Sequence, residues 1–120
     1  MDMRSIKFRA FINGEMIYDL AYEEYAPIND LLKGTDNLMQ FTGLFDKQGV
    51  EIYEGDILKF ITFGFNAESF ITVIEFKNAS FRLKNGRNLF YFGQTDFTKL
   101  DDCRVIGNIY ENPELLEDKQ

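Results

Sequence analysis

The chain has 120 residues, contains no histidine and only one cysteine, and carries a net charge of −7. Histidine supplies the commonest general base and transition-metal ligand, so Ser-His-Asp and Cys-His centres are excluded. With a single cysteine, zinc and iron–sulfur sites of the ordinary kind are excluded too, and we expect no cofactor. The acidic balance disfavours nucleic acid and anionic membranes as partners.

The length is that of one domain, and the aromatic content of 16%, with 13 Phe and 6 Tyr, favours a sheet-rich fold. Cys103 cannot form an internal disulfide, which indicates an intracellular protein because small secreted domains are usually disulfide-rich. We expect no signal peptide in residues 1–5. We also expect no membrane span, since no apolar run approaches the roughly 20 residues that one requires.

Two segments of alternating side chains begin the chain and predict a β-hairpin. Residues 6–12 and 15–21 flank Asn13-Gly14, a two-residue turn composition in which both positions favour positive φ. Residues 22–37 then predict a loop with a short helix.

Short strands separated by turn residues fill the rest of the chain. The apolar segments 57–63 and 70–77 predict strands covered on both faces. Asn85-Gly86 predicts a second hairpin turn, between strands at 81–83 and 88–92. Asn112 is expected to cap a short helix over 113–118. The remaining expected elements are strands at 38–42, 51–53 and 104–110, a turn at 46–49 and a tight turn at 54–56.

This pattern predicts a mostly β, β-rich α+β fold. We expect a small barrel or a strongly bent antiparallel sheet, with an N-terminal hairpin and short helices. The chain is treated as a single domain, 1–120, in which a hairpin subdomain, 1–37, is an alternative division. A barrel-like part would then cover 38–112, before the short helix at 113–118.

Carboxylates are the residues left for enzyme chemistry. Glu54 and Asp56 are weak candidates for a magnesium site, and Asp101-Asp102 is a second acidic pair. Turn composition explains both sets better, because Gly55 supplies positive φ and Asp bonds its own backbone. We therefore predict no catalytic residue and no enzyme activity. Cys103 follows two acids and is expected to be structural rather than nucleophilic.

A basic hairpin is the sharper binding candidate. No acid occurs from Phe76 to Thr95, whereas Arg82, Lys84 and Arg87 fall there. If the turn forms, these cations gather at one tip, and Tyr91 with its neighbouring phenylalanines could stack on bases. The alternative interpretation is a solvated turn above core aromatics.

An acidic aromatic stretch supplies the candidates for a protein partner. Tyr22 and Tyr25 flank two glutamates, a composition that a partner could recognise. A solvated acidic loop is the alternative interpretation.

Three stretches together resemble the YopX-like family of phage and prophage proteins from Gram-positive bacteria. They are residues 6–11 (Ile-Lys-Phe-Arg-Ala-Phe), residues 38–57 from Leu-Met-Gln-Phe-Thr-Gly-Leu-Phe-Asp-Lys to Glu-Ile-Tyr-Glu-Gly-Asp-Ile, and residues 105–116 (Val-Ile-Gly-Asn-Ile-Tyr-Glu-Asn-Pro-Glu-Leu-Leu). The opening strand of the family often ends in Ala-Trp, where this chain has Ala10-Phe11. The resemblance implies a phage origin, a β-rich fold with a small barrel, and the cytoplasm of the infected bacterial host. It implies no established activity and no catalytic residue.

Three functional hypotheses remain open from the sequence. The first is a non-enzymatic module that binds a host or phage protein, or itself. The second is a nucleic-acid-binding barrel that uses the basic hairpin 82–87. The third, more remote, is a carboxylate–magnesium enzyme.

Overall fold

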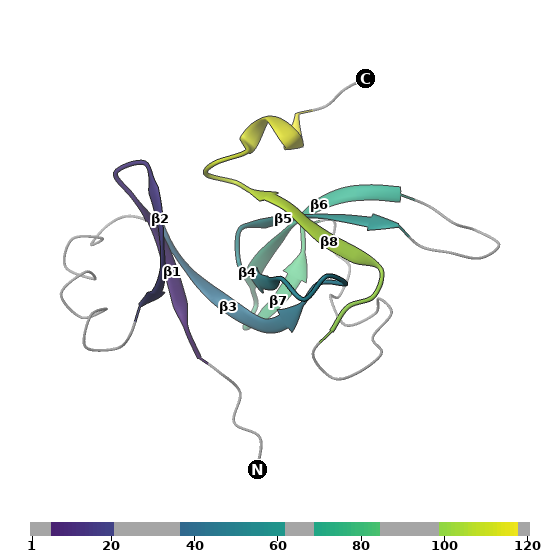
Figure 1. Ribbon diagram of the computed structural model, residues 1–120, viewed down its shortest axis with the longest axis horizontal. Helices are drawn as coiled ribbons and strands as arrows, with labels where there is room; N and C mark the ends of the chain where they lie inside the picture. The colour runs from purple at the N-terminus through teal and green to yellow at the C-terminus, as the bar shows by residue number, and fades with distance from the viewer. Residues whose placement is uncertain (1–5, 21–36, 62–68, 85–98, 118–120) are drawn as a thin grey trace, which may run out of the picture. The chain divides into compact units, whose positions relative to one another are not determined.

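The computed structural model describes residues 6–20, 37–61, 69–84 and 99–117 (Figure 1). This part of the chain is mostly β, as predicted, and one of its two antiparallel sheets is curled into a half-barrel. The chain divides into two compact units, residues 1–41 and 42–120.

The two sheets have four strands each, in the orders β2-β1-β3-β4 and β7-β6-β5-β8. The strands are β1 (Phe8–Ile12), β2 (Glu15–Leu20), β3 (Leu38–Phe45), β4 (Glu51–Tyr53), β5 (Asp56–Ile61), β6 (Ser69–Lys77), β7 (Ser80–Leu83) and β8 (Cys103–Asn108). A 3-10 helix, η2 (Pro113–Leu116), follows β8. In the part of the chain that the structure describes, no helix is both long and apolar enough to cross a membrane.

The first hairpin is confirmed. Asn13 and Gly14 have φ of 52° and 82°, the two positive values that a type I′ turn needs. Ala10 is fully buried in the first unit, packed by partly buried apolar side chains of β1, β2 and β3. The neighbouring Arg9 is also only 3% exposed, and its guanidinium carbon lies 5.8 Å from the centroid of the Tyr18 ring.

Strand β3 is longer than predicted and reaches Phe45. Gly43 stays within the strand at φ 87°, a conformation that side-chain-bearing residues rarely adopt. The buried hydroxyl of Thr42 donates to the carbonyl of Ile52 at 2.7 Å and accepts from the Leu44 amide at 3.1 Å. These contacts keep the strand paired where the sequence predicted that it would end.

The core of the second unit forms from side chains of β3 to β8. Phe60 is fully buried and stacks on Phe70, its cross-strand neighbour, with ring centroids 5.1 Å apart. The other buried members of this cluster are Leu44, Ile52, Leu58, Ile74, Leu83, Leu100 and Cys103.

The expectation that strands 57–63 and 70–77 are covered on both faces is wrong at three positions. Ile61 of β5 is 43% exposed, and Ile71 and Phe76 of β6 are 44% and 49% exposed, although the middle of each strand is buried. Strand β6 turns into β7 through Asn78 and Ala79, both at positive φ. Alanine is not a residue that signals such a turn, which is why the sequence did not reveal it. The predicted turn at Asn85-Gly86 lies outside the described residues.

Strand β8 ends at Asn108, two residues before the predicted end at 110. The Asn108 side chain is buried and accepts from the amides of Tyr110 and Glu111 at 3.0 and 2.9 Å, which turns the chain out of the sheet. The expected cap is wrong, because the Asn112 side chain makes no hydrogen bond to η2. Its Oδ1 instead accepts from the Asn108 amide at 3.2 Å.

Candidate functional site

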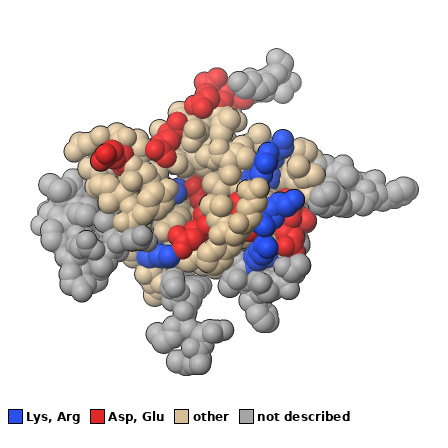
Figure 2. Space-filling model, in the orientation of Figure 1, with Lys and Arg blue, Asp and Glu red and all other residues tan. Residues whose placement is uncertain are grey.

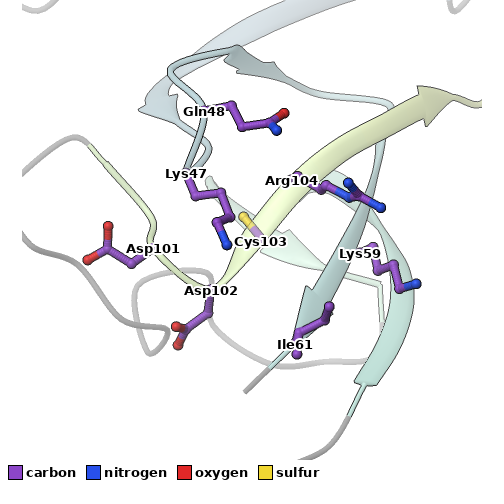
Figure 3. A pocket seen from close by; sticks show the side chains of 8 residues that line it. All are labelled: Lys47, Gln48, Lys59, Ile61, Asp101, Asp102, Cys103 and Arg104. Atoms are coloured by element: carbon purple, nitrogen blue, oxygen red, sulfur yellow. The ribbon is translucent and has the colours of Figure 1, made fainter. Parts of the chain in front are cut away.

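A hollow of about 200 Å³ lies within the second unit, where β5 and β8 meet the loop after β3 (Figure 3). Its lining combines three cations, two aspartates, a glutamine, an isoleucine and the cysteine. The residues are Lys47, Gln48, Lys59, Ile61, Asp101, Asp102, Cys103 and Arg104.

Two cations of the hollow are paired across the sheet. Lys59 of β5 and Arg104 of β8 are directly opposite in the antiparallel register, so their side chains leave the same face. Like charges in this relation destabilise a sheet. Among the described residues, no carboxylate makes an ion pair with Lys47, Lys59 or Arg104.

The charges of the hollow are separated in space. In Figure 3 the Lys59 and Arg104 side chains extend to one side of β8, whereas Lys47 lies with Asp101 and Asp102 on the other. Figure 2 shows Lys and Arg side chains gathered right of centre on the face in view, with acidic side chains beside them. The hollow therefore has a basic end formed by Lys59 and Arg104, and a mixed end where Lys47 lies near the two aspartates.

The loop that carries Lys47 is fixed by a buried carboxylate. Asp46 is fully buried, and its Oδ1 accepts from the amides of Gln48 and Val50 at 2.8 and 2.9 Å. Its Oδ2 accepts from the Val105 amide of β8 at 2.9 Å. The Lys47 amide donates to the Cys103 carbonyl at 3.0 Å, so the loop is bonded directly to β8 beside Arg104.

Exposed apolar side chains continue the surface beyond the cations. Ile71 of β6 lies directly opposite Lys59, which places Ile71, Lys59 and Arg104 in one row across three strands. Ile61 lies two residues along β5 on the same face. Ile61 and Ile71 are 43% and 44% exposed. We call Lys59, Ile61, Ile71 and Arg104 the β5–β8 face.

Cys103 borders the hollow but is not a reactive thiol. Its side chain is buried in the core cluster. Burial, and then the charges of Asp46 and Asp102, raise the pKa of the thiol to about 12. Because the thiolate is the nucleophile, this setting suits the structural role that the sequence predicted.

Comparison with known proteins connects this arrangement to a family. The family model described as YopX protein matches residues 11–117. The chain belongs to the YopX family. The solved structure of protein EF1440 from Enterococcus faecalis is similar to it, with a TM-score of 0.65 and 28% sequence identity, covering 96% of this chain and 100% of that one. A comparison with curated proteins found no match.

Only part of the basic hairpin predicted for this YopX protein is described. Arg82 lies opposite Glu75, and its Nη2 donates to Ser80 Oγ at 3.3 Å, while Lys84 is exposed. Arg87 and Tyr91 lie outside the described residues, as do Tyr22 and Tyr25.

The weak metal candidates belong to a turn. Asp56 is buried, and its Oδ2 accepts from the Tyr53 amide at 2.7 Å, across Gly55 at φ 89°. Glu54 occupies the same turn. The described residues contain no group of three or more acidic or cysteine side chains placed to hold a metal ion.

Sequence reasoning missed the β5–β8 face of the YopX chain. The sequence pattern places Lys59 within a predicted apolar strand and Arg104 at the start of another predicted strand, and it does not indicate that the two residues are neighbours. Nothing local signals their pairing, since it depends on the register of two strands far apart in the sequence. The one available signal is a lysine and an arginine placed inside otherwise apolar strands.

Proposed function

We propose that this YopX protein is a non-enzymatic binding module of a phage or prophage, acting in the cytoplasm of the infected bacterial host. It binds a protein partner, either a host or phage protein or a second copy of itself, through the β5–β8 face. The observation that carries the proposal is that two exposed isoleucines adjoin two cations on one face of a sheet, and that no described carboxylate forms an ion pair with these cations.

The chemistry of the face defines the partner segment. Exposed apolar side chains beside cations are complementary to a segment that combines acidic and apolar residues. Completing the burial of Ile61 and Ile71 contributes about 1 kcal/mol each, since full burial of such a side chain is worth roughly 1.5–3 kcal/mol. The charges then contribute orientation and association rate more than affinity.

The chain itself contains a segment of this kind. Residues 111–118 combine four acids with two leucines, and Leu116 is 40% exposed. A peptide of this sequence is therefore a defined probe for self-association, separate from capture of a host or phage protein.

The test compares variants of the face with a matched control. Ile61→Ser and Ile71→Ser are expected to weaken binding of the partner, or of the 111–118 peptide, about tenfold in combination. Val50→Ser removes an apolar side chain that is 45% exposed and is not part of the β5–β8 face, and should stay within about twofold of wild type. Binding is measured by calorimetry, and self-association by sedimentation. The proposal is contradicted if the protein is monomeric at about 100 μM and binds no partner with a Kd below about 1 mM.

Nucleic acid is the second candidate, favoured by the like-charged pair Lys59 and Arg104 together with the exposed Lys84. The sequence adds Arg82, Arg87 and Tyr91 as candidates for the same ligand. Binding of single-stranded DNA should weaken steeply with salt, because each phosphate contact releases a counterion. Absence of binding at low salt rules this candidate out, and binding tighter than that of any acidic peptide favours it over the protein partner.

A further inference from the structure

We propose that the basic end of the hollow is a subsite for a single oxyanion, a carboxylate or a phosphate group, held between Lys59 and Arg104. Lys47, the third cation of the lining, lies on the other side of β8 near the aspartates. The inference deepens the proposed function, because the partner would carry the anion, but the subsite binds a free anion whether or not that partner exists.

The register supplies the first argument. Directly opposite residues on one sheet face have Cβ atoms about 4.5–5.5 Å apart, so the two cations repel each other. No described carboxylate offsets this repulsion. An oxyanion between them can accept hydrogen bonds from both side chains. The planar Arg104 guanidinium can donate two parallel hydrogen bonds, and the Lys59 ammonium acts as a point charge.

The distribution of charge supplies the second argument. Asp101 and Asp102 line the hollow from the opposite side of β8 and repel an anion there. The same aspartates leave the basic end available, since neither forms an ion pair with the three cations. At about 200 Å³, the hollow has room for a group the size of several water molecules. Charge and size together favour one anionic group rather than an extended chain.

The rigidity of the frame supplies the third argument. Lys59 and Arg104 project from neighbouring strands of one sheet, and the Lys47 amide is bonded to the Cys103 carbonyl. Three hydrogen bonds to the Asp46 carboxylate hold the same loop. A site whose backbone is already fixed loses little entropy when a ligand binds, so a small anion can bind measurably.

The test is titration of the full chain with inorganic phosphate, and separately with acetate, at constant ionic strength. We expect saturable NMR shifts that centre on Lys59 and Arg104, with a Kd of about 1–10 mM for phosphate. Arg104→Gln and Lys59→Gln should each weaken binding at least about fivefold. Lys77→Gln removes an exposed cation of β6 that does not line the hollow, and should stay within about twofold.

Two results overturn the subsite. One is the absence of a saturable shift up to about 100 mM phosphate. The other is an equal affinity in Lys59→Gln, Arg104→Gln and wild type, with circular dichroism showing that all are folded. Phosphate binding without any protein partner contradicts the proposed function alone. Partner binding without a response to phosphate or acetate contradicts the subsite alone.

Discussion

Replacing Asp46 by Asn tests how the hollow is held together. The carboxylate is fully buried and accepts three backbone hydrogen bonds at 2.8–2.9 Å. In Asp46→Asn the amide oxygen keeps the bonds from Gln48 and Val50, each weaker by roughly 1 kcal/mol without the charge. The new NH₂ group faces the Val105 amide, and that unpaired donor costs about 1–3 kcal/mol. We expect a total loss of about 3–5 kcal/mol.

The free energy of unfolding is measured by urea titration. Unfolding is monitored by tyrosine fluorescence and circular dichroism, because the chain has no tryptophan. Glu114→Gln makes the same carboxylate-to-amide change at an exposed position, and should change stability by less than about 0.5 kcal/mol. Hydrogen exchange should show that the Val105 amide loses protection first. A loss below about 1 kcal/mol, with Val105 still protected, would refute the account of this loop.

Two further predictions concern β8. Since the pKa of Cys103 is raised from 9.0 to about 12, its stability contribution is complete below pH 9 and is lost as pH rises toward 12. Between pH 8 and pH 10, the free energy of unfolding in urea should fall by about 1.4 kcal/mol more for wild type than for Cys103→Ala. An equal fall in both proteins would contradict this prediction. A Cβ at Gly107 would lie 2.6 Å from Asn112 Oδ1, so Gly107→Ala should cost about 1–3 kcal/mol. Adding Asn112→Gly removes all three side-chain atoms that lie within 2.6–2.8 Å of this Cβ and should recover most of that cost, whereas additive losses in the double-mutant cycle would show that the contact does not limit stability.

Local chemistry made much of the fold predictable. Asn13-Gly14 signals its own turn, and Glu54 to Asp56 form the tight turn that their composition predicts. The turn at Asn78 and Ala79 was missed because alanine adopts a conformation there that it rarely favours, and the surrounding sheet imposes it.

The candidate site was less predictable, because it depends on contacts between distant segments. The turn composition after Phe45 was recognised, but the bond from Asp46 to Val105 requires the loop to lie against β8. The pairing of Lys59 with Arg104 also needs the strand register, which a bulge in β8 shifts near Ile57 and Leu58. Charge pattern alone pointed to Arg82 and Lys84 instead.

If Lys59 and Arg104 bind an anion between them, their pairing destabilises the anion-free protein. The most direct measurement is the free energy of unfolding of Lys59→Met without added phosphate, compared with Lys77→Met as the control for the apolar gain. We expect Lys59→Met to be more stable than wild type, with a gain that exceeds that of Lys77→Met by roughly 0.2–1 kcal/mol, because a like-charged cross-strand pair is removed. A loss of more than about 1 kcal/mol would contradict the claim, since Lys59 would then stabilise the fold itself.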